Sequence, residues 1–288
     1  MSVRKASFAG SWYPATASAC EKEIQGFLNE PNFKKIPEAD YLGGIVPHAG
    51  WTFSGNLACQ VIAALGGPDT GQKPDVIAVF GMHMHPNQTP CIMVEGAWET
   101  PFGDIEIETG LARDLTQKFS FSIETPDHFT PDNTIELQLP FIKYFFNTSR
   151  LIPIGVPPAG KSLEIARHLA KRARQSNLTI KVVGSTDLTH YGPNYGYAPV
   201  GLDKKAVDWV RDHNDRKAID RMLAMDSEKL IADGIASQNA CCSGAAAAAI
   251  AAADALGAKN GQLVGYSSSY EKHPGDSFVG YTGILFNR

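Results

Sequence analysis

Short apolar runs alternate with segments of helical spacing along nearly the whole chain, and this alternation constrains the fold more than any other feature. The runs are rich in Val, Ile and Leu and end at Gly, Pro or charged residues, which is typical of strands buried in a sheet. The segments between them carry apolar residues at intervals of three and four, which predicts helices. The predicted strands are 42–47, 75–81, 90–98, 150–156, 180–187, 263–270 and 279–286, and the predicted helices are 15–30, 54–67, 162–177, 202–226, 227–237 and 245–257.

The alternation predicts an α/β fold with three layers, α/β/α, around a central mixed and largely parallel sheet. The two C-terminal runs lie close together with turn residues between them, so this part of the sheet is expected to be antiparallel. No Ser- or Pro-rich linker divides the chain, and we expect residues 1–288 to form a single domain. The alanine-rich segment 245–257 is expected to be a helix packed closely against the sheet, because alanine favours helices and has a small side chain.

Composition excludes several classes of function. A net charge of −4 gives no basic surface for nucleic acid. The N-terminus lacks an apolar segment of signal-peptide length, and we find no run of about 18 apolar residues, so we expect no membrane association and a cytoplasmic location. The five cysteines are odd in number and scattered, which disfavours a disulfide framework. Antiparallel edge strands could pair two copies across a two-fold axis, so a homodimer is a further expectation.

Polar residues follow several of the apolar runs, at the point where each predicted strand ends. In an open α/β sheet, ligands bind at the carboxyl ends of the strands, so these side chains are the candidate site. Imidazoles and a thiolate gathered at one sheet edge would form a metal site of borderline softness, suited to iron, zinc or copper. The candidates are His48, His83, His85, Asp187 and His190, together with Cys241 and Cys242.

The two adjacent cysteines are expected in the first turn of the alanine-rich helix. Ser237, Gln238 or Asn239 could cap this helix. A helix N-terminus stabilises anions and lowers the pKa of a thiol, so Cys241 or Cys242 would be a better metal ligand there than in the middle of a helix.

Each candidate also has a purely structural interpretation. His48 could be a turn histidine that bonds to the backbone, and Asp187 could cap a turn or a helix. Residues two apart on a strand share a face but differ in depth, so only one histidine of the pair after the second strand is expected to be a ligand. At least one of the two adjacent cysteines is expected to be a small buried hydrophobe.

Seven short motifs occur in order over nearly the whole length: FAGSWYP, VPHAGWTFSG, TPFGDIEIE, DNTIELQLPFI, STDLTHYG, NACCSG and DSFVGYTGILF. Together they resemble the Memo family, which includes the AmmeMemoRadiSam system protein B proteins of bacteria and archaea. That family is similar in fold to the class III extradiol dioxygenases of the LigB type, in which two histidines and a carboxylate bind iron. The resemblance implies a LigB-like domain in which a cysteine replaces the carboxylate. Such a softer ligand set is compatible with iron or copper redox chemistry.

Residue by residue, the resemblance implies that His48, His83 and Cys241 are the metal ligands. His85 and Cys242 are the alternates for the second and third ligands. The two histidines are two residues apart and the two cysteines are adjacent, so the alignment with the family leaves open which member of each pair is the ligand.

The same resemblance places His190 where the dioxygenases have their acid/base histidine, and it places Asp187 along the wall of the site. Glu136 is expected to orient a ligand without touching the metal. Asn133 stands where many family members carry a histidine, so a mechanism that uses that histidine does not transfer to this chain.

These features favour a mononuclear redox enzyme that uses iron, or copper as the next choice. A binding or adaptor module that keeps the fold but lacks turnover is the first alternative. A zinc-assisted hydrolase, with the same three ligands and a water, is the second. The sequence specifies no substrate, and the expected partner is a small molecule or a peptide ligand.

Overall fold

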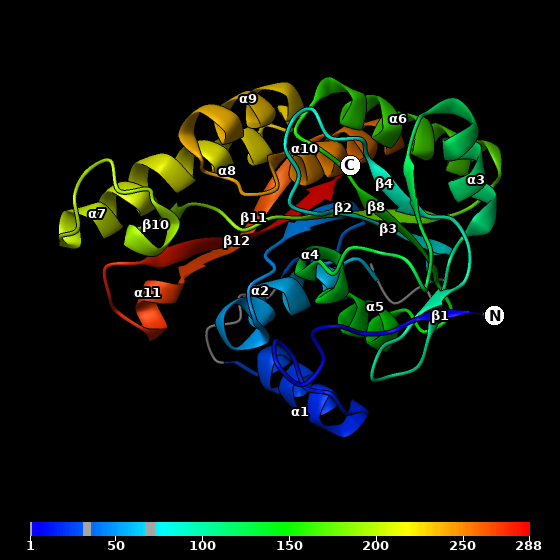
Figure 1. Ribbon diagram of the computed structural model, residues 1–288, viewed down its shortest axis with the longest axis horizontal. Coiled ribbons are helices and arrows are strands. Elements are labelled where there is room, and N and C mark those ends of the chain that lie inside the picture. The colour runs from blue at the N-terminus through cyan, green and yellow to red at the C-terminus, as the bar shows by residue number, and fades with distance from the viewer. Residues whose placement is uncertain (1, 31–35, 67–72) are drawn as a thin grey trace.

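A computed structural model describes residues 2–30, 36–66 and 73–288, and it confirms the three-layer α/β/α fold (Figure 1). The central sheet has nine strands in the order β10-β12-β2-β9-β3-β8-β4-β7, and β11 pairs with β12. Its parallel centre consists of β2 (Tyr41–Val46), β9 (Ile180–Ser185), β3 (Val76–Gly81) and β8 (Arg150–Gly155). β9, β3 and β8 lie within runs predicted from their apolar, β-branched composition, and β2 begins one residue before its predicted run 42–47.

On each side of this centre, the neighbouring strand runs antiparallel to it. On one side, β12 (Phe278–Asn287) pairs antiparallel with β2, β11 (Asn260–Ser268) and β10 (His190–Tyr191). On the other side, β4 (Cys91–Met93) pairs antiparallel with β8 and parallel with β7 (Ser122–Glu124). The mixed, largely parallel sheet therefore has the predicted character.

The predicted strand 90–98 is wrong as a single element. It divides into β4 and β5 (Ala97–Trp98), and β5 joins a separate three-stranded sheet with β1 (Val3–Arg4) and β6 (Ile105–Glu106). The break lies at Gly96, whose φ of 96° belongs to a region that glycine enters without a Cβ clash. The chain turns there and leaves the central sheet.

Two groups of helices cover the two faces of the sheet (Figure 1). The first face carries α3 (Thr109–Lys118), α6 (Gly160–Gln175), α8 (Arg216–Leu223), α9 (Ser227–Ser237) and α10 (Ser243–Leu256). The second carries α1 (Ala17–Leu28), α2 (Trp51–Ala64), α4 (Asn133–Glu136) and α5 (Leu139–Phe145). Each face has its own apolar core, as expected for a doubly covered sheet.

The remaining helices lie at the β10 end. The predicted helix 202–226 is α7 (Lys204–Trp209), one π-helical turn called η2 (Val210–Asp215), and α8. A 3-10 turn, η1 (Pro193–Tyr195), follows β10, and α11 (Ser269–Lys272) follows β11. The predicted helix 54–67 begins earlier, at Trp51, and the end predicted at Gly67 lies outside the described residues. Within the described ranges no helix is both long enough and apolar enough to cross a membrane.

Helix α10 packs against the sheet at close range because both surfaces carry small side chains. Every residue from Ser243 to Ala253 is buried. A Cβ atom on Gly184 of β9 would lie 2.8 Å from the Ala245 carbonyl oxygen and 2.8 Å from the Ala249 methyl group. This spacing brings the start of α10, and the cysteines just before it, to the end of β9.

We expect Gly184→Ala to destabilise the protein by about 1–3 kcal/mol, because the added methyl overpacks the contact between β9 and α10. The matched control is Gly160→Ala at the start of α6, where a Cβ would meet nothing within 4 Å, so little change is expected. Urea unfolding of both variants measures the difference. Equal midpoints for the two variants would contradict the close packing.

Candidate metal centre

Three predicted site residues leave the parallel strands at the same level. Val46 pairs with Ser185 in the β2–β9 register, and β3 ends beside them at Gly81. His48, Asp187 and His83 each come two residues after the end of their strand. Because parallel strands in register end at one edge of a sheet, these three side chains meet there. The structure thus brings together His48 and Asp187, which are 139 positions apart in the sequence.

The backbone just before His83 is in an unusual conformation. Met82 has a φ of 74°, in the left-handed region that a side chain with a Cβ seldom adopts. The Met82 N–H donates to Thr134 Oγ1 at 2.7 Å, which holds this turn. Such strain persists only where the surroundings enforce it. The turn directs His83 toward the other candidates. Both histidines are exposed, but only His83 belongs to the cluster.

The cysteines lie before α10 and not in its first turn, which corrects the sequence-based expectation. Cys242 is the N-cap residue and α10 starts at Ser243, without a side-chain cap. None of the three predicted capping residues caps it; Asn239 donates its amide to the Asn214 carbonyl at 3.0 Å instead. The cysteines are held by the β9 loop, because the Cys241 N–H donates to the Asp187 carbonyl at 3.1 Å.

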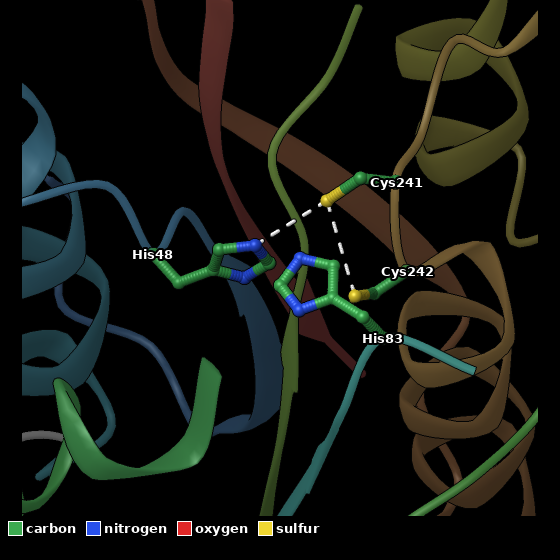
Figure 2. A group of neighbouring side chains, drawn as sticks. All are labelled: His48, His83, Cys241 and Cys242. Atoms are coloured by element: carbon green, nitrogen blue, oxygen red, sulfur yellow. Dashed lines mark hydrogen bonds between the residues drawn. The ribbon is translucent and has the colours of Figure 1, made fainter. Parts of the chain in front are cut away.

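Four potential ligand atoms converge at this edge, one each from His48, His83, Cys241 and Cys242 (Figure 2). All of them lie within 4.8 Å of one another. Cys241 Sγ is 3.3 Å from His48 Nε2, and the two imidazole rings meet edge to face at 5.0 Å between centroids. Metal bonds of about 2.1 Å to nitrogen and about 2.3 Å to sulfur place ligand atoms at such separations, so the donor set fits a metal ion.

The hydrogen bonds of Ser185 fix the orientation of His48. Ser185 donates its hydroxyl hydrogen to the Thr134 carbonyl at 2.7 Å, so its oxygen is free to accept from His48 Nδ1–H at 3.1 Å. This assigns the proton of a neutral imidazole to Nδ1 and leaves the Nε2 lone pair directed at the cluster. A ligand histidine is commonly held through its other nitrogen in this way. His48 itself is buried.

Asp132 plays the corresponding part for His83. Its Oδ2 lies 3.0 Å from His83 Nδ1 and also accepts the His83 backbone N–H. The hydrogen bond that His83 donates to Asp132, with help from Cys241, raises the pKa of His83 to about 10 against the opposing effect of burial. Burial opposes ionisation of Asp132, but the bonds from His83 and Thr134 outweigh it and lower the pKa of this carboxyl. Nε2 of His83 is thereby left for the cluster.

Of the two cysteines, Cys241 carries the negative charge. Burial disfavours its thiolate, yet the hydrogen bond from Cys242 and the His48 imidazole hold its pKa well below the usual value. The Asp187 N–H also donates to Cys241 Sγ at 3.3 Å. Burial and the adjacent thiolate raise the pKa of Cys242, which keeps its proton and packs into the apolar core. Cys241 is therefore the better ligand of the pair.

Asp187 and His190 form one wall of the site. Asp187 Oδ1 accepts the His48 backbone N–H at 2.7 Å, and its Oδ2 is 3.8 Å from Nε2 of both His48 and His190. Burial lowers the pKa of His190, but the nearby Asp187 carboxylate and Cys241 thiolate outweigh it and raise this pKa to about 10. His190 Nε2 is buried, and its polar neighbours are groups of the site itself.

Asn133 and Glu136 bond to different parts of the protein. Asn133 donates its amide to the His48 carbonyl at 2.8 Å, so it holds the first candidate ligand through the backbone. Both carboxylate oxygens of Glu136 accept bonds from the N-terminal segment, from the Ser7 and Phe8 N–H groups and the Tyr13 hydroxyl. This corrects the expectation that Glu136 orients a ligand: its bonds hold the segment that supplies part of the cavity wall.

An open cavity of about 490 Å³ lies over the cluster. His48, His83, Asn133, Asp187 and His190 line its floor and walls. Four aromatic side chains from separate segments also line it: Trp12, Phe53, Tyr195 and Tyr281. A volume of this size suits a small molecule.

Sequence reasoning did not identify Ser185, Asp132 or Asp215 as part of this region. Asp132 directly precedes a short helix and caps it, a pattern visible in the sequence as Asp-x-Thr, but its contact with His83 depends on the tertiary structure. Ser185 is the last residue of a strand and gave no signal of its own.

Asp215 is a fully buried carboxyl beneath the strand of His190. Its Oδ1 accepts the Thr189 N–H at 2.9 Å and its Oδ2 accepts the Tyr266 hydroxyl at 2.8 Å. Burial raises the pKa of Asp215 from 3.8 to about 7, because these bonds and the charge of His190 only partly offset the lost hydration.

The chain matches the family model described as Memo-like protein over residues 4–285. A MEMO1 family protein of Pyrobaculum aerophilum is 30% identical over 100% of both chains. A second, from Methanopyrus kandleri, is 32% identical over 99% of each chain. A third, from Methanococcoides burtonii, is 29% identical over 98% of this chain and 99% of the relative.

Among solved structures, the chain is similar to an uncharacterised protein of Escherichia coli K12. The TM-score is 0.52 and the sequence identity 10%, and the match covers 84% of this chain and 98% of the other. At this identity the likeness shows a shared fold and nothing about activity.

We expect Asp215 to make the stability of the protein fall as the pH rises. Folded Asp215 keeps its proton up to a pKa of about 7, whereas the unfolded carboxyl loses it near 3.8, so the stabilisation is complete below pH 3.8 and is lost as pH rises through 7. Asp215→Asn stays neutral and should lack this component. Between pH 5 and pH 8 the unfolding midpoint of the wild type should fall by about 3 °C or more relative to the variant. Parallel pH profiles of the two proteins would show that Asp215 ionises normally.

Proposed function

The chain belongs to the Memo-like protein family, and we propose that it is a metal-dependent redox enzyme in which His48, His83 and Cys241 hold one iron ion, with copper as the next choice. The observation that supports this most directly is the convergence of two oriented imidazoles on the half-buried thiolate of Cys241 at the carboxyl edge of the sheet. Imidazole and thiolate donors together suit iron, copper and zinc.

Bound iron or copper would supply one-electron redox chemistry, and three protein ligands would leave further coordination positions for substrate or O₂. The residues of the chain do the rest. Ser185 and Asp132 hold the two imidazoles with Nε2 toward the metal position. The Cys242 sulfur lies 3.9 Å from the Cys241 sulfur and helps to stabilise its thiolate. These bonds fix the donor set before a metal arrives, which favours binding.

His190 and Asp187 are proposed to handle protons beside the ligands. His190 lines the cavity and its Nε2 faces Asp187 Oδ2 at 3.8 Å. A histidine in this position can donate a proton to a bound molecule, or take one, at Nε2. Asp187 stabilises the charged ring and holds the His48 backbone at the same time. The proposed substrate is a small molecule that fits the aromatic-walled cavity.

A binding or adaptor module without turnover is the second candidate. Asn133 supports it, because this side chain has no titratable group and is used to hold the His48 carbonyl. Trp12 and Tyr195, which are 41% and 45% exposed at the cavity, offer aromatic surface to a peptide ligand without chemistry. Zinc on the same three ligands would make a hydrolase the third candidate, and the identity of the metal separates it from the first.

We expect the protein, purified anaerobically without a histidine tag, to contain about one iron or copper ion per chain. His48→Ala, His83→Ala and Cys241→Ser should each lose it, because each removes one of three ligands. His85→Ala and Cys242→Ser are the matched controls and should keep it. Elemental analysis measures the metal, and circular dichroism verifies that each variant is folded.

The outcomes separate the candidates. Zinc alone at full occupancy, with no redox signal, would favour the hydrolase. No metal in any form, even after reconstitution, would sink the redox proposal and leave the metal-free binding module.

We expect Ser185→Ala to weaken metal binding about 10- to 100-fold, because the variant loses the acceptor that orients His48. The matched control is Ser162→Ala, which removes another buried serine that donates to a backbone carbonyl, that of Pro157. Both variants should lose similar stability, about 1–3 kcal/mol. Competition titration against a chelator gives the affinities. If both serine variants bind metal equally well, Ser185 does not orient the ligand.

A further inference from the structure

The π-helical turn η2 places two adjacent polar side chains inside the protein. Asn214 is 5% exposed and Asp215 is fully buried, whereas the three residues before them are exposed. A π turn adds one residue to a helical run and shifts which side chains face inward, and such turns are frequent at functional sites. Asn214 and Asp215 therefore occupy the interior face that Ala218 and Ile219 continue one turn later.

Both side chains bond to Thr189, the residue directly before His190. Asp215 Oδ1 accepts the Thr189 N–H at 2.9 Å, and Asn214 Nδ2 donates to Thr189 Oγ1 at 2.9 Å. The Thr189 carbonyl accepts the Gly280 N–H at 3.1 Å. Every polar group of Thr189 is thus engaged, so the backbone that carries His190 has little freedom.

Asn214 also holds the segment that leads to Cys241. Its amide donates a second bond, to the Ser237 carbonyl, at 3.0 Å. Its own carbonyl accepts the side chain of Asn239 at 3.0 Å, and Asn239 is fully buried two residues before Cys241. One residue therefore contacts both the strand of His190 and the loop of the thiolate.

The fit around the neighbouring carboxyl is tight. Asp215 Oδ2 accepts the Tyr266 hydroxyl at 2.8 Å, and a Cβ on Gly280 would overlap the same oxygen. Strands β11 and β12 thus close over Asp215 and keep η2 in place against β10.

We propose that Asn214 and Asp215 are positioning residues that set the placement of His190 relative to Cys241. The inference rests on the proposed function, since it assigns Cys241 to the metal and His190 to the cavity beside it. The turn η2 acts through Thr189, Ser237 and Asn239 and is not among the residues that line the cavity.

The test is Asn214→Asp, which keeps the shape of the side chain but replaces both N–H donors with an acceptor. The first readout is Co²⁺ alone as a probe: the sulfur-to-cobalt charge-transfer band should shift or weaken, and the Kd should rise at least about 10-fold, the lower end for loss of a supporting bond. The second is the imidazole NMR signal of His190 in metal-free protein, which should move. Asp212→Asn, exposed on the same turn, should change neither.

A buried variant without these contacts controls for lost stability. Ile219→Val on α8 removes one buried methylene group and should leave the cobalt band, the Kd and the His190 signal as in the wild type. Should Asn214→Asp fail to fold, Thr189→Val removes the acceptor of one bond and should move the same readouts in the same direction.

The outcomes distinguish the two proposals. A folded variant with wild-type cobalt affinity and His190 signal, or an equal change in Ile219→Val, overturns the positioning role. If the wild type binds no Co²⁺, the metal proposal fails; the positioning role then stands if Asn214→Asp moves the His190 signal and the rate at which iodoacetamide alkylates Cys241, and falls if it moves neither.

Discussion

The register of the four parallel strands is the constraint on which the site depends. Val46 and Ser185 are partners at the ends of β2 and β9, and β3 ends at the same level at Gly81. A shift of one residue in any pair would turn the following side chains to the other face of the sheet. The positions of His48, His83 and Asp187 therefore follow from the observed register.

The thiolate reaches this edge through packing between small residues. Gly184 on β9 and the alanines of α10 allow the helix to approach the sheet closely. The same closeness lets the Cys241 N–H bond to the Asp187 carbonyl and the Asp187 N–H bond to the Cys241 sulfur. A helix with larger side chains would stand farther from the sheet and would separate the sulfur from His48. The alanine-rich stretch therefore serves the site as well as the core.

A layer of polar residues surrounds the candidate ligands, and its members come from both sides of the sheet. Ser185 and Asp132 define which nitrogen of each imidazole faces the cluster. Asn133 holds the His48 backbone, and Asn214 connects the His190 strand with the loop before Cys241. The buried side chains of Ser185 and Asn214 use their donors, as expected where an unpaired polar group would cost free energy.

The sequence by itself determined the α/β/α class, six of the seven predicted strands as single elements, and the candidates at strand ends, because burial of a strand leaves a local pattern. It also kept His83 with His85 and Cys241 with Cys242 as open pairs. The tertiary structure separated them. After the left-handed turn at Met82, His83 lies in the cluster and His85 lies outside it. The charge falls on Cys241 because His48 and the Asp187 N–H face its sulfur. The break at Gly96, the bonds of Glu136 to the N-terminal segment and the inward turn of Asn214 were likewise decided by contacts between distant segments. No local pattern encodes such contacts, since they depend on which surfaces meet after the sheet has formed.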